Sequence, residues 1–197
     1  RMFRTKIYYG LDIDLASLQT GLKKFADEKT FGILADMARL EAVPAGSVDV
    51  VVSTNTLYQL LLQQRIIALE HLCRITSPAG HLFVEMSLDQ DFDRMLAILK
   101  NNFQKAQICY YKNLLSQFYE WLFERDGYLG NHPIAGKRPF RLLAWLLSRA
   151  EYLTSGSRTG NRHCLIVADK KKNLEQANFE LPFKNMIEGR IFNLLEN

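Results

Sequence analysis

Two aspartates follow successive apolar segments and form the first candidate for chemistry. Asp12 lies at the end of "KIYYGLDID" and Asp36 at the end of "FGILAD". If both segments are strands of an open α/β sheet, both carboxylates lie at the edge where ligands bind. One carboxylate can accept two hydrogen bonds from a ribose diol, and the other can accept one from an exocyclic amine. Helix capping is the alternative, and spacing alone leaves the two interpretations even.

Asp14 is better explained as a helix cap. It directly precedes residues 15–27, in which apolar side chains recur at helical spacing. Its carboxylate can accept hydrogen bonds from the unpaired N–H groups of the first helical turn. We therefore expect Asp14 to cap this helix and Asp12 to serve another role.

Strands and helices alternate along most of the chain. The patterns predict strands at residues 5–11, 31–36, 48–54, 81–87, 105–112 and 162–169, and helices at 15–27, 59–76, 89–102, 113–125 and 139–153. Alternation with short loops predicts an α/β fold, in which helices cover both faces of a mostly parallel sheet. The turn "SPAG" at 77–80 is expected to end the second helix before the next strand begins.

One domain with a helical insertion and a tail accounts for the 197 residues. The domain covers residues 1–173, and its insertion at about 113–161 is too long for a plain connection. We expect this insertion to form a lid over the carboxyl ends of the strands, with a mobile loop at 126–138. The tail, 174–197, is amphipathic, and Pro182 is expected to separate a loop from a short helix.

Composition limits the classes of function. Charged residues make up 23% of the chain, and a net charge of +4 without a long basic block gives no clear nucleic-acid signal. No apolar run reaches the roughly 18–20 residues of a membrane span, and no signal peptide is visible, so we expect a cytoplasmic protein. Cys73, Cys109 and Cys164 are expected to be buried free thiols. No set of His, Cys and carboxylate residues has metal-ligand spacing, and no metal is expected.

Four segments carry a family pattern in the right order. They are "YYGLDID", "ILADMARLEAVPAGSVDVVVSTNTLYQL", "HLCRITSPAGHLFVEM" and "RHCLIVADK". Together they resemble the class I S-adenosylmethionine-dependent methyltransferases, in particular the small-molecule branch known as methyltransferase type 11. The resemblance implies a Rossmann-like sheet whose last strand, 162–169, is antiparallel. The Asn/Asp-Pro-Pro-aromatic signature of base methylation is replaced by "STNTLYQ", which favours a small-molecule substrate.

The resemblance also implies S-adenosylmethionine as the cofactor and assigns residues to it. Asp12 would bind the ribose hydroxyls, and Ile13 would pack on the adenine. Asp36 would accept a hydrogen bond from the adenine amine, and Met37 would lie against the ring. Methyl transfer is then the expected activity.

Residues around the fourth strand of that family's sheet are expected to hold the methionine part and the substrate. Ser53 and Thr54 would approach the methionine through backbone groups. Asn55 and Tyr58 follow, where the substrate should arrive, although an aromatic residue at a helix start more often serves packing. No catalytic residue is identified, because direct methyl displacement needs a base only when the nucleophile must lose a proton.

The aromatic segment 118–130 suits either a lid over the substrate or an ordinary packed helix. Tyr119 and Trp121 are its candidate substrate contacts. Three histidines are assigned structural roles, namely His71, His132 and His163.

One family element has no counterpart. The first strand and the Gly-rich loop that cradles the methionine should lie before Arg1, and no G-x-G occurs in the chain. We therefore expect the sequence to begin inside a longer protein, and its sheet to lack the central strand. Two alternatives stay open: a non-catalytic protein that binds a cofactor or partner, and, less favoured, a dinucleotide-dependent oxidoreductase. A homodimer also stays open.

Overall fold

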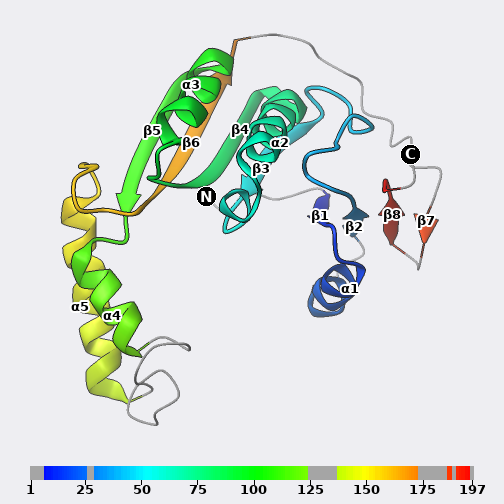
Figure 1. Cartoon of the computed structure of the whole chain (residues 1–197). Coiled ribbons are helices and arrows are strands. Elements are labelled where there is room, and N and C mark those ends of the chain that lie inside the picture. The colour runs from blue at the N-terminus through cyan, green and yellow to red at the C-terminus, as the bar shows by residue number, and fades with distance from the viewer. Residues whose placement is uncertain (1–6, 26–28, 124–136, 173–185, 188–189, 196–197) are drawn as a thin grey trace.

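A computed structural model describes residues 7–25, 29–123, 137–172, 186–187 and 190–195 of the chain (Figure 1). The elements, in chain order, are β1 (Tyr8–Asp12), α1 (Leu15–Lys24), β2 (Thr30–Leu34), β3 (Val48–Ser53), the 3-10 helix η1 (Leu57–Gln59), α2 (Leu62–Ile75), β4 (Thr76–Ser87), α3 (Phe92–Asn102), β5 (Phe103–Tyr111), α4 (Leu114–Phe123), α5 (Arg138–Thr154), β6 (His163–Lys171), β7 (Met186–Ile187) and β8 (Ile191–Asn193). This alternation confirms the predicted α/β class. Within the described ranges, no helix is long and apolar enough to cross a membrane.

The strands form two four-stranded sheets instead of one continuous sheet. One has the order β1-β2-β8-β7 and the other the order β3-β4-β6-β5. The β1–β2 and β3–β4 pairs are parallel, and β6 runs antiparallel to both β4 and β5, as predicted. Among the described residues, β1 and β3 each pair along one edge only. Within the described chain, no strand of one sheet pairs with a strand of the other.

One of two buried apolar clusters nevertheless connects the two sheets. Ile33 and Ala35, from β2 and the residue that follows it, belong to the same buried cluster as Leu82, Val84 and Ile166 of the second sheet. Helices α2 and α3 cover one face of the second sheet (Figure 1). On β3, by contrast, Val50 and Val52 are exposed. In the described part of the chain, helices thus cover one face of this sheet and not both.

Strand β4 begins earlier than the sequence predicts. Residues 77–80, expected to form a turn, lie within the strand, and the pairing with β3 shifts register between Val48 and Val50. Such an irregularity admits the Pro-containing segment, because Pro78 has no N–H to donate to a ladder. Gly80 is required here, since a Cβ atom would lie 2.7 Å from the carbonyl oxygen of Asp49.

Two smaller expectations are also corrected. The tail forms the short strands β7 and β8 where a short helix was expected after Pro182, and β8 pairs in parallel with β2. Pairing to an existing strand edge satisfies backbone groups that an isolated short helix would leave to water. Cys73 and Cys164 are buried free thiols as expected, but Cys109 is exposed.

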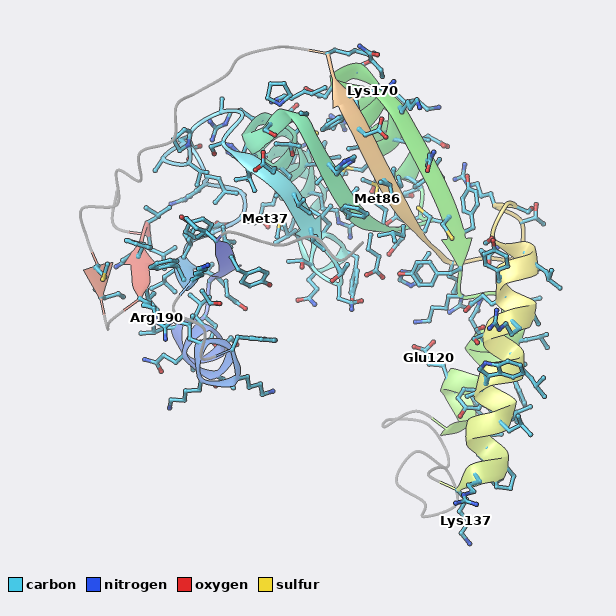
Figure 2. The ribbon with its side chains drawn as sticks, turned by 180° about the vertical axis from the view of Figure 1, so that it is seen from behind. Met37, Met86, Glu120, Lys137, Lys170 and Arg190 are labelled. Carbon is cyan, nitrogen blue, oxygen red and sulfur yellow. The ribbon has the colours of Figure 1, made fainter. Side chains whose placement is uncertain are left out.

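Helices α4 and α5 form the predicted helical insertion. They make an antiparallel pair that extends beyond the carboxyl end of β5, and both views place it across the molecule from β1 and α1 (Figures 1 and 2). The loop expected to be mobile, 126–138, lies outside the described residues except for its last two positions.

We expect Gly80→Ala to destabilise the protein by ~1–3 kcal/mol, because the new methyl group overlaps backbone and side-chain oxygens and β4 must shift. Urea denaturation measures this loss. Gly21→Ala in α1 is the matched control: no atom lies within 4 Å of its Cβ position, so a stabilisation of ~0.5–1 kcal/mol is expected from the helix preference of Ala. Equal effects of the two substitutions would contradict the close approach at Gly80.

Candidate functional site

The structure brings Asp12 and Asp36 to the same edge of one sheet. Asp12 is the last residue of β1 and lies opposite Leu34, the last residue of the parallel strand β2. The amide nitrogen of Ala35 donates to the carbonyl oxygen of Asp12 at 3.0 Å. Asp36 follows directly, so both carboxylates lie beyond the carboxyl ends of adjacent strands.

Each of the two carboxylates uses one oxygen to order its own loop. Oδ1 of Asp12 accepts from the amide nitrogen of Asp14 at 3.0 Å, and Oδ1 of Asp36 accepts from that of Ala38 at 2.9 Å. No hydrogen bond to the other oxygen, Oδ2, is found for either residue within the described chain. Each loop is thus held by one carboxylate oxygen, while the other is available to an external donor.

Asp14 caps α1, as the sequence predicts. Its carboxylate accepts from the amide nitrogen of Ser17 at 2.9 Å, from that of Ala16 at 3.3 Å and from the Ser17 hydroxyl at 2.7 Å. These hydrogen bonds, led by the one from the Ser17 side chain, lower the pKa of Asp14. The first-turn donors of α1 are therefore satisfied without Asp12.

The two apolar neighbours of these aspartates differ in placement. Ile13 is 62% exposed, which leaves its side chain available to a ligand. Met37 is half-buried and packs against the core (labelled in Figure 2). A flat apolar ligand held by the carboxylates would contact the exposed side chain of Ile13 and the core-packed side chain of Met37.

The end of β3 carries two unusual features. Ser53 is buried, and its hydroxyl has no hydrogen-bond partner within the described residues. Asn55 has a φ of 57°, the left-handed region that asparagine tolerates better than most residues. Thr54 is exposed, and Tyr58 on η1 is 38% exposed. An unpaired buried hydroxyl next to a sharp turn is typical of a ligand-facing strand end.

A buried carboxylate that the sequence analysis did not single out lies beside this strand end. Glu85 of β4 has a side chain only 8% exposed. Its Oε2 accepts from the amide nitrogen of Asn55 at 2.9 Å, and its Oε1 lies 3.5 Å from Nδ1 of His163 on β6. The hydroxyl of Tyr111, at the end of β5, also hydrogen-bonds to Glu85. One carboxylate thus connects the ends of three strands to the turn at Asn55.

Aromatic rings enclose the His163 imidazole. Its centroid lies 6.1 Å from that of Tyr58, nearly edge-on, and 5.7 Å from that of Tyr111. Burial lowers the pKa of His163, and the nearby Lys112 lowers it further, whereas Glu85 acts in the opposite direction. Burial and the hydrogen bond to Glu85 raise the pKa of Tyr111. His163 is therefore a neutral base at pH 7 and Tyr111 a neutral hydroxyl.

The sequence predicts a structural role for His163 and assigns none to Glu85 or Tyr111. The available signal was Glu85 itself, a charged residue inside the apolar strand "HLFVEM". Such a residue needs partners, but the partners lie on β5 and β6, far along the chain, and only the fold identifies them.

The two aromatic candidates, Tyr119 and Trp121, lie on α4. Trp121 is 60% exposed and Tyr119 is half-buried. The helix is tied to the site at its base, where Nζ of Lys112 lies 2.6 Å from Oε1 of Glu120. The hairpin lies across the molecule from β1, the strand that ends at Asp12, and does not lie over the end of that strand as the lid prediction expects (Figures 1 and 2). A substrate contact of Tyr119 or Trp121 stays a prediction.

Comparison with known families gives one match, over residues 1–84, to the family model described as a methyltransferase domain. The matched segment contains both strand-end aspartates, Ser53 and most of β4. It supports the resemblance to class I methyltransferases of the type 11 branch that the sequence predicts. No curated protein matches the chain.

Two solved structures share the fold. A TehB-like SAM-dependent methyltransferase from Corynebacterium glutamicum is 12% identical, with a TM-score of 0.53 over 84% of this chain and 68% of that one. A phosphoethanolamine N-methyltransferase 2 from Haemonchus contortus, in complex with phosphomonomethylethanolamine and S-adenosylhomocysteine, is 16% identical, with a TM-score of 0.52. That match covers 82% of this chain but only 43% of the Haemonchus protein. At these identities the likeness is one of fold.

We expect Glu85→Gln and Lys112→Gln to move the pKa of His163 in opposite directions. Loss of the Glu85 charge removes a stabiliser of the imidazolium and lowers the pKa, whereas loss of the Lys112 charge raises it. NMR titration of the imidazole ring protons measures both shifts, with His71 as an internal reference. If both substitutions moved the pKa of His163 in the same direction, the placement of His163 between Glu85 and Lys112 would be contradicted.

The same lowered pKa predicts how stability depends on pH. The folded-state pKa of His163 lies below the ordinary value of 6.5. Protons therefore bind the unfolded chain more readily, and the contribution of His163 is complete above about pH 6.5 and falls as the pH drops toward the folded-state pKa. His163→Gln should remove this part of the pH dependence in thermal melts.

Proposed function

We propose that this chain, with its methyltransferase-type fold, is an S-adenosylmethionine-dependent methyltransferase that acts on a small-molecule acceptor. The observation that carries the proposal is the pair Asp12 and Asp36, placed together beyond adjacent parallel strands within the family-matched segment. Each offers one carboxylate oxygen to an external donor. A nucleoside presents such donors on its ribose hydroxyls and on its exocyclic amine.

The residues present fit the cofactor. Asp12 holds the ribose diol, and the exposed Ile13 packs on the adenine. Asp36 accepts from the adenine amine, with Met37 beside the ring. Ser53, whose buried hydroxyl has no partner in the described chain, lies with Thr54 on the side of the methionine part. The unpaired hydroxyl supports this assignment, because a bound polar group would satisfy it.

The Glu85–His163 pair, with Tyr58 and Tyr111, forms the acceptor side of the proposed site. The cofactor supplies a methyl group already activated on a sulfonium, so the protein has to align the acceptor and remove a proton where the acceptor carries one. His163 is neutral at pH 7, and its Nε2 takes the acceptor proton. Glu85, 3.5 Å from Nδ1, stabilises the imidazolium that forms. Asn55 and Tyr58 border the acceptor.

We expect Asp12→Ala to weaken S-adenosylmethionine binding well over tenfold. Two charge-assisted hydrogen bonds are lost, each worth ~1.5–3 kcal/mol. Asp12→Asn should lose less, since an amide oxygen still accepts. Calorimetric titration of S-adenosylmethionine into the protein measures the affinities.

Asp14→Ala is the matched control for Asp12. It removes the cap of α1 and should lower the melting temperature while leaving cofactor affinity nearly unchanged. A folded Asp12→Ala protein with unchanged affinity would remove Asp12 from the site and leave the family resemblance as one of fold only.

His163→Gln tests the acceptor side separately. Cofactor affinity should stay unchanged, whereas methyl transfer to acceptors that must lose a proton should fall about 10²–10⁴-fold, the usual contribution of general base catalysis. The measurement is S-adenosylhomocysteine formation with a panel of small alcohols, amines and carboxylic acids. His71→Gln, which loses the contact of a 13% exposed imidazole on α2 with Glu41, away from Glu85, is the control. An active His163→Gln protein would contradict the role of His163.

A further inference from the structure

The α4–α5 hairpin, residues 114–123 and 138–154, exposes apolar side chains along both helices. On α4 these are Leu114, Leu115, Phe118 and Trp121; on α5 they are Leu142, Leu143, Trp145, Leu146, Tyr152 and Leu153. Spacings of three, four and seven residues place Leu114, Phe118 and Trp121 on one face of α4, and Leu142, Trp145, Leu146 and Leu153 on one face of α5. Leu114 is 72% exposed and Leu153 is 84% exposed. A helix pair that served only to pack against the domain would bury these faces.

The charges that the hairpin presents outward are positive. Lys137 and Arg138 are exposed where α5 begins, and Figure 2 places Lys137 at the end of the hairpin farthest from the sheets. Arg149 is also exposed, and its guanidinium lies 5.3 Å from the centroid of the Trp145 ring. Arg149 is four residues from both Trp145 and Leu153, so this cation lies within the apolar face of α5.

The carboxylates described on the two helices are engaged at the base of the hairpin. Glu120 pairs with Lys112 at 2.6 Å. Glu151 accepts from the backbone amides of Lys112 and Asn113. The apolar faces therefore lie among cations whose charge no neighbouring carboxylate of the described helices offsets.

We propose that the α4–α5 hairpin docks on an anionic lipid surface, with its leucine and tryptophan side chains in the interface and Lys137, Arg138 and Arg149 against the headgroups. Amphipathic helices of this composition bind membranes through buried apolar area and attraction to anionic lipids. A second copy of the chain fits less well, because two such hairpins would bring like charges together. The proposal does not depend on cofactor binding.

Tryptophan fluorescence gives a direct measurement, because both tryptophans of the chain, Trp121 and Trp145, lie on the hairpin. The probes are vesicles of pure phosphatidylcholine and vesicles of phosphatidylcholine with phosphatidylglycerol in a 3:1 ratio. We expect a blue shift and co-sedimentation with the anionic vesicles only, weakened as NaCl rises from 50 to 500 mM.

Two double variants separate the apolar and the electrostatic contributions. Leu142→Gln with Leu146→Gln should abolish vesicle binding. Lys137→Gln with Arg138→Gln should weaken it about 25-fold, at about fivefold for each charge. All four side chains are exposed, so thermal melts should match the unchanged protein.

The matched controls lie elsewhere on the molecule. Lys100→Gln with Lys105→Gln removes two exposed cations near the other end of β5, and Leu61→Gln changes a leucine that is 75% exposed. Both should leave vesicle binding unchanged. Absence of binding to anionic vesicles, or binding that the controls reduce as much as the hairpin variants do, would overturn the proposal. Self-association in light scattering that only the hairpin variants abolish, without vesicle binding, would assign the face to a second copy instead.

Discussion

The buried carboxylate of Glu85 is the constraint on which the strand ends depend. A carboxylate that is 8% exposed is tolerated only when donors surround it. The amide of Asn55, in the turn after β3, and the hydroxyl of Tyr111 on β5 donate to it, and Nδ1 of His163 on β6 lies 3.5 Å away without forming a hydrogen bond. The need to satisfy one charge thus fixes the relative positions of three segments, and it keeps Asn55 in its left-handed conformation.

In the part of the chain that the structure describes, the two sheets are joined by side-chain packing and not by backbone hydrogen bonds. Their hydrogen-bond ladders do not meet, since β1 and β3 each pair along one edge within the described chain. The core joins them through side chains, because residues 35–43 cross from the end of β2 to α2. The carbonyl oxygen of Leu40 accepts from Arg74, and Leu40 and Val43 are buried in the common cluster. The strand-end aspartates are therefore held on a sheet that is tied to the rest by packing.

The features that the sequence predicts correctly depend on interactions between residues close together in the chain. Asp14 caps α1 by accepting hydrogen bonds from residues only two and three positions away. The β-branched residues of β3 favour a strand whichever strands pair with it. The start of β4 was not predictable, because the strand continues through residues 77–80 as an irregularity between the pairs Val48–Thr76 and Val50–His81. The tail was missed because β8 exists as a partner of β2. For the site, Asp12 and Asp36 follow from strand order, whereas the Glu85–His163 pair requires β4 and β6 to be placed side by side.

Lys112 connects the candidate acceptor side to the hairpin. It follows β5 with a φ of 65°, and its amide is held by Glu151 of α5. Its side chain pairs with Glu120 of α4, and its charge lowers the pKa of His163. Any contact that moved α4 would change the distance between Glu120 and Lys112, and with it the field at the imidazole. Binding of a surface to the hairpin would then change the pKa of His163 without any contact with the imidazole. Lys112 makes this possible because it both pairs with α4 and supplies the charge near His163.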